Sequence, residues 1–290
     1  MPLNSPIDEH GALFVVATPI GNLEDVTYRA VRVLREADMV LAEDTRLTKK
    51  LLAAHEIFAP LLSLHEHNEE DRTPMVLKRI RSGQRVALVS DAGTPGISDP
   101  GFHLVREAAA AGFTVHPIPG PSAAIAALSV SGLPTDTFLF AGFLPKKAAR
   151  RRQKLELLDH VPATLIFYES PHRISDLLKE AAEILGDREA VLAREVTKLH
   201  EEFLRGTLKE IGGAVAERTS VKGECTLLVA GAPEIPPSDE KTVESAVRQG
   251  LADRHLSASR LAAEIAREHN VPKSHVYEMI LRMRSGRQTN

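Results

Sequence analysis

The sequence predicts an α/β protein made of two α/β domains and a small helical C-terminal domain. Three observations predict this fold class. In residues 12–135, short apolar runs alternate with helical patterns, and the runs end in polar or Gly/Pro-rich loops. In residues 136–232, strand-like runs outnumber helical ones. In residues 241–290, apolar side chains recur only at helical spacing, so residues 233–290 are expected to form a linker and a helical tail.

The first domain, residues 1–135, is expected to hold a parallel sheet covered by helices on both faces. Continuous apolar strands that alternate with helices are typical of βαβ units. Gly83 and Gly112 follow two of the helical patterns and are suited to end them, because glycine readily adopts a positive φ. The predicted strands are 12–17, 39–43, 85–89 and 114–118, and the predicted helices lie near 26–37, 45–55, 73–82, 101–112 and 121–132.

The second domain, residues 136–232, has more strands per helix, which predicts a mixed sheet. Its predicted strands are 137–141, 163–168, 190–195, 201–205 and 224–230, and its predicted helices are 171–185 and 207–218. A run with three prolines, 233–239, is typical of a linker. The tail beyond it resembles a helix-turn-helix. Two interpretations of the tail stay open: contact with nucleic acid, and packing or dimerisation.

Composition favours a cytoplasmic protein. Cys225 is the single cysteine, which excludes an internal disulfide, and no apolar run approaches the roughly 20 residues of a membrane helix. Residues 1–11 lack the basic and apolar segments of a secretory signal. His65 and His67 lie beside acids in the run HEHNEE, but no third ligand is indicated nearby, so we expect a polar surface loop and no metal.

The loop SDAGTPGISDPG, residues 90–101, directly follows the apolar run RVALV. Its glycines permit close backbone approach and its prolines stiffen the chain between them. In open α/β sheets, ligands bind at the carboxyl ends of the strands. Similar loops follow the other strands of the first domain, so we expect a ligand site at this sheet edge. Loop closure and helix capping are the alternative roles for Asp91 and Ser122.

Seven motifs taken together resemble one family. They are TPIGNLED (18–25), AEDTR (42–46), SDAGTPGISDPG (90–101), PGPSA (119–123), GFLP (142–145), YESPHR (168–173) and AREVTK (193–198). In this order they resemble the bacterial small-subunit rRNA 2′-O-ribose methyltransferases of the tetrapyrrole-methylase superfamily, over residues 12–231. The resemblance implies two α/β domains with S-adenosylmethionine (SAM) in the cleft between them, a decoding-centre cytidine of 16S rRNA as substrate, and a homodimer.

The matching motifs also suggest site residues. Those expected to bind the cofactor are Pro19, Gly21, Asn22, Asp91, Ala92, Gly93, Ser122, Tyr168 and Thr226. A ribose hydroxyl is a poor nucleophile, so a general base is expected as well. The candidate catalytic residues are Glu43, Asp44, Glu169 and Glu195 as acids, with Arg46, Arg173, Arg194 and Lys198 as cations that hold phosphate. Each acid has a cation within four residues, so salt bridges among them are the alternative, and the identity of the base stays open.

A basic run, KKAARRRQK at 146–154, places six cations in nine positions. A run of this kind is often only a solvated helix face, but beside a candidate cleft it favours a polyanionic partner. The expected RNA contacts are Lys146, Lys147, Arg150, Arg151 and Arg152. Residues 241–290 carry a net charge of +4, which leaves −7 for the rest of the chain.

Three other functions fit the sequence less well. A tetrapyrrole-like small-molecule methyltransferase would not require the basic segments. The loop after the first strand is also less glycine-rich than in the wider superfamily, and residues 90–93 replace the Gly-Asp-Pro of porphyrin methylases. A non-enzymatic nucleic-acid-binding or dimerisation module needs no small-molecule cleft. A nicotinamide dehydrogenase is disfavoured because no GxGxxG follows the first strand.

Overall fold

The computed structural model describes residues 11–233, 239–252, 257–269 and 271–286. Contacts divide the chain into two compact units, residues 1–232 and residues 233–290. Most of the predicted linker, residues 234–238, and the N-terminal residues 1–10 lie outside the described residues. In the described part of the chain, no helix combines the length and the apolar character needed to cross a bilayer.

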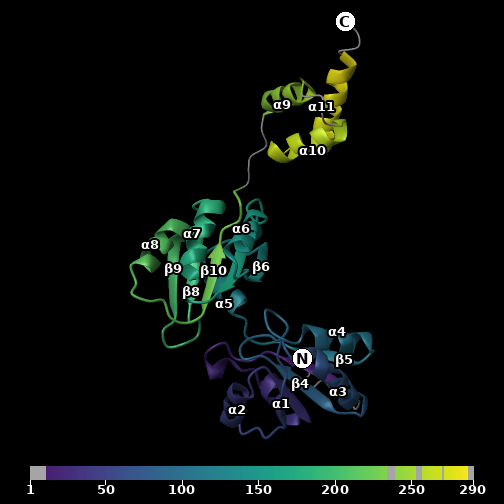
Figure 1. The fold of residues 1–290 in the computed structure, drawn as a ribbon, viewed down its shortest axis with the longest axis vertical. Helices are drawn as coiled ribbons and strands as arrows, with labels where there is room; N and C mark the ends of the chain where they lie inside the picture. The colour runs from purple at the N-terminus through teal and green to yellow at the C-terminus, as the bar shows by residue number, and fades with distance from the viewer. Residues whose placement is uncertain (1–10, 234–238, 253–256, 270, 287–290) are drawn as a thin grey trace. The chain divides into compact units, whose positions relative to one another are not determined.

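The first sheet of the larger unit is entirely parallel. Its strands are β1 (Ala12–Val16), β2 (Met39–Ala42), β3 (Leu61–Ser63), β4 (Arg85–Val89) and β5 (Thr114–Ile118), in the order β3-β2-β4-β1-β5 (Figure 1). Helices α1 (Tyr28–Glu36) and α2 (Thr45–Ala54) pack on one face, and α3 (Glu69–Arg81) and α4 (Phe102–Ala110) pack on the other. The prediction of a doubly covered parallel sheet is confirmed.

One strand and one helix of this half of the larger unit differ from the prediction. Strand β3 was not expected because it is only three residues long and half-buried. Helix α3 begins at Glu69 and not at Thr73, so part of the HEHNEE run is helical. The Glu69 side chain is buried and accepts a hydrogen bond of 2.9 Å from the backbone N–H of Leu104, in the first turn of α4.

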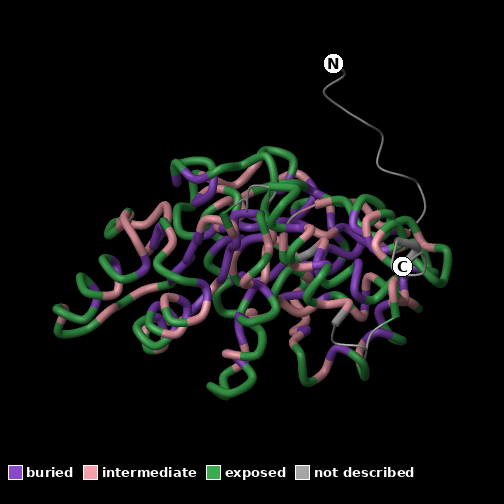
Figure 2. The backbone as a smooth tube through the Cα atoms, turned by 90° about the horizontal axis from the view of Figure 1, so that it is seen from above, coloured by how far each residue is buried: buried purple, intermediate pink, exposed green. Residues whose placement is uncertain are grey.

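The second sheet is mixed, as predicted. It consists of β6 (Phe138–Phe143), β7 (Thr164–Glu169), β8 (Glu189–Arg194), β9 (Glu202–Thr207) and β10 (Cys225–Val229), in the order β6-β7-β10-β8-β9. Only β6 and β7 are parallel. Helices α6 (Ala148–Glu156), α7 (Ile174–Ile184) and α8 (Leu208–Ala216) cover one face, and α5 (Ala123–Ser129) packs on the other. Figure 2 marks the buried, intermediate and exposed stretches along the backbone. Helix α6 was not predicted as an element.

An irregularity in β6 changes which side chains share a face. Phe140 pairs with Ile166 and Phe143 pairs with Tyr168, and the register shifts between Phe140 and Gly142. In a regular strand, residues three apart point to opposite faces. The extra residue of the bulge instead puts Phe140 and Phe143 on the same face as Tyr168.

The smaller unit is a bundle of α9 (Glu240–Ala252), α10 (Ala258–Glu268) and α11 (Lys273–Gly286). The Ser257 side chain caps α10 by accepting from the backbone N–H of Arg260. The bundle has its own apolar core, which includes Val243, Val247, Leu261, Ile265, Val276 and Ile280.

Candidate functional site

A pocket of ≈ 370 Å³ lies within the larger unit, where the strand ends of both sheets contribute residues. The first sheet supplies the loops after β1, β4 and β5, with Ile20, Gly93 and Ser122 among the lining residues. The second sheet supplies the ends of β6 and β7 and the start of β10, including Phe143, Tyr168 and Thr226. The lining is mainly apolar, with a few polar side chains, as in small-molecule sites.

The loops after β1 and β4 are fixed to each other by backbone hydrogen bonds. Thr18 and Gly93 form an isolated bridge, in which each N–H donates to the other residue's carbonyl at 2.8 and 3.1 Å. Gly93 has φ +76°, and Ser98 later in the same loop has φ +64°. A positive φ at a residue other than glycine costs free energy and is common at ligand sites. The loop is therefore held in a rigid, locally strained conformation against the pocket.

Tyr168 lines the pocket and is anchored by hydrogen bonds and ring contacts. Its hydroxyl accepts a hydrogen bond of 3.0 Å from the backbone N–H of Ala124 and also bonds the Ser122 side chain. Phe140 and Phe143 contact its ring edge-on, with ring centroids 4.9 and 5.7 Å away. Burial raises the pKa of Tyr168, so its hydroxyl stays protonated.

Acidic side chains give the pocket a negative character. Burial, with repulsion from Glu43 and Asp91, raises the pKa of Asp99 to about 7, although a hydrogen bond with Ser90 partly offsets the effect. Burial, followed by repulsion from Asp91, also raises the pKa of Glu43. Glu224 lines the pocket as well. No group of three or more metal-ligating side chains is found among the described residues.

The predicted cofactor residues fall into two groups. Ala92, Gly93, Ser122, Tyr168 and Thr226 line the pocket. The other four, Pro19, Gly21, Asn22 and Asp91, are not among its lining residues.

Three residues of the second group make contacts within the protein. A Cβ added at Gly21 would meet the Lys198 side chain at 2.4 Å, so this glycine permits close packing between two loops. The Asn22 side chain caps the short 3-10 helix η1 (Leu23–Asp25) by accepting from Glu24 N–H. The Asp91 carboxylate accepts from Asp44 N–H at 2.9 Å and thereby joins the loops after β2 and β4. For Asp91 the loop-closing role is the observed one.

Most of the candidate catalytic residues are engaged in ion pairs. Arg173 donates to the buried Glu169 at 2.7 Å, and Arg46 pairs with Asp44 at 2.6 Å. These Arg46 hydrogen bonds hold the pKa of Asp44 at about 2. Arg194 pairs with Glu202, and Lys198 pairs with both Glu195 and Glu224. Glu169 is the one member of the predicted catalytic set that lines the pocket, and no ion pair is recorded for Glu43 among the described residues.

Sequence reasoning missed Asp99, Glu224, Phe143 and Ile97, which all line the pocket. Asp99 and Ile97 lie in the SDAGTPGISDPG loop, and Phe143 lies in GFLP. The motifs were therefore recognised, but the side chains within them that face the pocket were not. The signal that could have identified them was the presence of an aromatic residue, Phe143, and an acid, Asp99, within Gly/Pro-rich loops.

The basic run lies on and just before α6, and its members differ in exposure. Arg151 is buried and pairs bidentately with Glu180 at 2.6 and 2.7 Å, while Arg152 donates to Glu183 at 2.7 Å. The expectation that Arg151 contacts RNA is therefore wrong, because its guanidinium is already neutralised and inaccessible. Lys146, Lys147 and Arg150 are exposed, and within the described residues none of them makes an ion pair.

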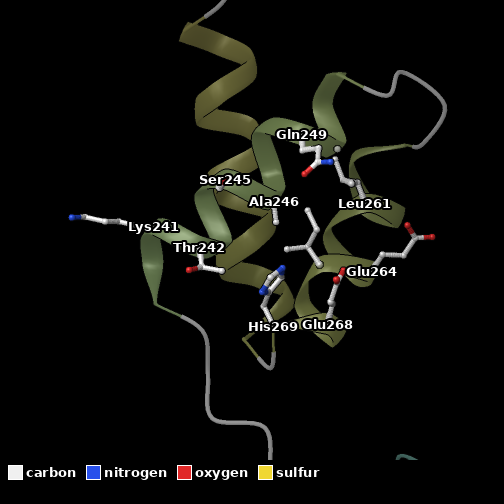
Figure 3. Close-up of a pocket in the computed structure, with 11 residues that line it drawn as sticks. Lys241, Thr242, Ser245, Ala246, Gln249, Leu261, Glu264, Glu268 and His269 are labelled. Carbon is white, nitrogen blue, oxygen red and sulfur yellow. The ribbon is translucent and has the colours of Figure 1, made fainter.

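A wider groove of ≈ 720 Å³ lies between α9 and α10 of the smaller unit (Figure 3). Its floor contains Ala246, Leu261 and Ile265, and its rim carries Lys241, Glu264, Glu268 and His269. The rim charges are of both signs, and the groove lacks the strand-end loops and strained backbone of the smaller pocket. The candidate site is therefore the pocket in the larger unit.

Comparisons with known proteins agree with this architecture. A model of the family described as "Tetrapyrrole (Corrin/Porphyrin) Methylases" matches residues 12–212. A protein of Xylella fastidiosa named "Ribosomal RNA small subunit methyltransferase I" is 52% identical over 260 residues, which cover 88% of this chain and 94% of the relative. A protein of the same name from Halalkalibacterium halodurans is 47% identical over 276 residues, covering 94% and 95%.

Solved structures resemble the chain in fold. Uroporphyrin-III C-methyltransferase from Thermus thermophilus, in complex with S-adenosylhomocysteine (SAH), has a TM-score of 0.56 at 23% identity and covers 75% of this chain and 97% of its own. The cobalt precorrin-4 methyltransferase structure has a TM-score of 0.58 at 21% identity and covers 78% and 97%.

Proposed function

The chain belongs to the tetrapyrrole methylase family, and it aligns over most of its length with relatives named as small-subunit rRNA methyltransferases. We propose that it is a SAM-dependent rRNA methyltransferase. Its finer activity is 2′-O-methylation of the ribose of a decoding-centre cytidine in 16S rRNA. The observation that carries the proposal is a pocket at the strand ends of both sheets, built from the family's motif loops.

The residues present fit SAM. The adenosine moiety would lie against the mainly apolar lining, where Gly93 presents backbone without a side chain. The carboxylate of Asp99 suits a ligand with a sulfonium group, because opposite charges attract in a partly buried site, whereas Glu224 is exposed and already paired with Lys198. Ser122 and Thr226 supply hydroxyls. When bound, SAM supplies an activated methyl group on its sulfonium, so positioning provides much of the catalysis.

The chain's own contribution is to orient the ribose and to accept its proton. Asp99 is the best candidate for the acceptor, because it lines the pocket and its pKa of about 7 lies near the working pH of a general base. Glu43 is the second candidate, since its pKa is also raised. Asp44, Glu169 and Glu195 are weaker candidates than sequence reasoning suggested, because each carboxylate is held in an ion pair.

RNA contact is assigned to the exposed cations Lys146, Lys147 and Arg150, with the basic tail as a supplement. Arg46 is exposed and is retained as a candidate phosphate contact, and Pro19, next to the lining residue Ile20, is retained as a candidate cofactor contact. The homodimer that the family resemblance implies would double the RNA-binding surface.

The proposal is tested by methyl transfer to small ribosomal subunits from cells that lack this modification. Labelled SAM should transfer its methyl group to 16S rRNA, and the modified nucleotide should resist alkaline cleavage, because that cleavage needs a free 2′-hydroxyl. Label on a base, which leaves the backbone cleavable, would contradict the 2′-O assignment. Transfer to a tetrapyrrole and not to the subunit would favour the alternative function, a small-molecule methyltransferase on the same fold.

A further inference from the structure

Phe143 is the exposed aromatic ring among the pocket-lining residues, some of which are buried and some exposed. The residue is 57% exposed, whereas the lining residues Glu169, Cys225 and Thr226 are at most 4% exposed. Other aromatic residues of the larger unit are equally or more exposed, including Tyr28, Phe58 and Phe102, but they do not line this pocket. The exposure therefore needs an explanation at the pocket itself.

The ring is held in place by its own strand. The bulge in β6 puts Phe143 on the same face as Tyr168, against which it packs edge-on at 5.7 Å. Tyr168 is in turn fixed by the backbone N–H of Ala124. An edge-on contact leaves a face of the Phe143 ring free for another planar group.

A second apolar side chain lies close to the same mouth. Ile97 lines the pocket and is 53% exposed. Its neighbour Ser98 packs on Gly142, the residue before Phe143, since a Cβ added there would lie 2.8 Å from Ser98 Oγ. Two exposed apolar side chains from the two halves of the larger unit thus line the same pocket.

Cations follow immediately along the chain. Lys146 and Lys147 are exposed and lie three and four residues after Phe143, which keeps Lys146 within about 11 Å of it along the backbone. RNA is recognised by stacking of unstacked bases on aromatic side chains and by cations on its phosphates. An aromatic ring followed closely by cations suits a nucleotide, because the ring can stack on the base while a lysine contacts the neighbouring phosphate.

We propose that Phe143, with Ile97 at the same opening, is the stacking platform for the base of the nucleotide whose ribose enters the pocket. This inference rests on the proposed function and assigns a positioning residue for it. The ring positions the nucleotide through its base and takes no part in proton transfer.

Kinetics with unmodified small subunits test the assignment. Phe143→Ala and Phe143→Leu should each raise KM about tenfold, because stacking on an aromatic ring is lost in both, while Phe143→Tyr should stay within about twofold of the wild type. Phe58→Ala is the matched control, since Phe58 is 97% exposed and away from the pocket. Wild-type KM in the Phe143→Leu variant would overturn the stacking role.

Calorimetry with SAH separates a base platform from a cofactor contact. The three Phe143 variants should bind SAH as the wild type does. If Phe143→Ala weakens SAH binding as much as it raises KM, the ring belongs to the cofactor site and the inference is wrong.

Fluorescence gives a readout that does not depend on activity. The chain contains no tryptophan, so Phe143→Trp and Phe58→Trp each introduce a single reporter. Cytidine 5′-monophosphate, added to SAH-saturated protein, should quench the emission of Phe143→Trp and leave that of Phe58→Trp unchanged. Equal responses of the two reporters would contradict the inference. Failure of the wild type to methylate subunits, with selective quenching retained, would instead reject the proposed rRNA substrate.

Discussion

At the scale of single residues, Asp99 is a pocket carboxylate whose charge changes near neutral pH. Its pKa of about 7 lies well above the ordinary 3.8, so it gains a proton at the acid end of the neutral range and loses it at the basic end. SAM carries a sulfonium charge that SAH lacks. The negative form of Asp99 should therefore stabilise SAM and leave SAH nearly unaffected.

The first prediction concerns this difference. Between about pH 5.5 and pH 8.5, the ratio of SAM affinity to SAH affinity should rise about five- to tenfold as Asp99 deprotonates, because the attraction is absent below its pKa and present above it. The use of a ratio removes the titration of groups common to both ligands. In Asp99→Asn the ratio should be flat with pH, as measured by calorimetry. In Asp91→Asn the ratio should still rise, but at lower pH, because the Asp91 repulsion that helps to raise the pKa of Asp99 is removed. A flat ratio in that variant would show that Asp91 and not Asp99 carries the effect.

Gly142 offers the second prediction. It has φ +62°, and an added Cβ would approach Ser98 Oγ to 2.8 Å. Gly142→Ala should therefore lower the free energy of unfolding by about 1–3 kcal/mol and weaken SAH binding, because the pocket loop must shift. Gly213 in α8 has open space at its Cβ position, so Gly213→Ala should raise stability by about 0.5–1 kcal/mol with SAH affinity unchanged. Urea unfolding and calorimetry measure both effects, and undiminished SAH binding in Gly142→Ala would argue against the contact.

At the scale of elements, the sequence predicted what depends on local pattern and missed what depends on tertiary contact. Long apolar runs located β1, β2, β4, β5 and the mixed sheet correctly. Helix α6 was hidden because it buries only Arg151 and Leu155, which gives little apolar periodicity. Asp99 was missed for a related reason: Asp91 directly follows the strand, but the fold of the loop brings Asp99 to the pocket. The position of Asp99 at the pocket depends on the conformation of the whole loop and could not be predicted from the spacing of residues in the sequence.

The third prediction separates the two kinds of cation on α6. Arg151→Ala should lower the free energy of unfolding by about 3–5 kcal/mol, because it leaves the largely buried Glu180 without its partner. Lys147→Ala and Arg150→Ala should change stability by less than about 0.5 kcal/mol. Combined, these two should weaken RNA binding and reduce the slope of log affinity against log salt by about 2. An unchanged slope would show that the basic run 146–154 is a solvated helix face that does not contact RNA phosphates.

At the scale of the whole molecule, the chain consists of two units with separate cores. Among the described residues, the apolar clusters of the larger unit contain no residue of the tail, and the tail's cluster contains no residue of the larger unit. The pocket lies wholly within the larger unit. Cofactor binding and the contribution of the tail should therefore be separable.

The fourth prediction tests that separation. A chain ending at Ala232 should unfold cooperatively and bind SAH with wild-type affinity, since it keeps the complete pocket. It should lose most methylation of assembled subunits, because the tail's positive charge is removed from a catalytic unit that is net acidic. Light scattering on both chains would show whether the tail also determines oligomeric state. Full-rate methylation by the shortened chain would favour packing as the role of the tail helices.

The strand order of the first sheet also determines when this sheet can fold during synthesis of the chain. β1 pairs only with β4 and β5, so Ala12 finds its partners at Arg85 and Thr114. During synthesis at about 5–20 residues per second, the first strand therefore waits roughly 4–14 s for the approximately 70 residues that separate it from β4. Throughout that interval the apolar segment Ala12–Val16 is present on the nascent chain without its partner strands. Ribosome-bound chaperones are thus most needed before residue 89 emerges, and slow codons placed ahead of β4 should increase aggregation more than the same codons placed after β5.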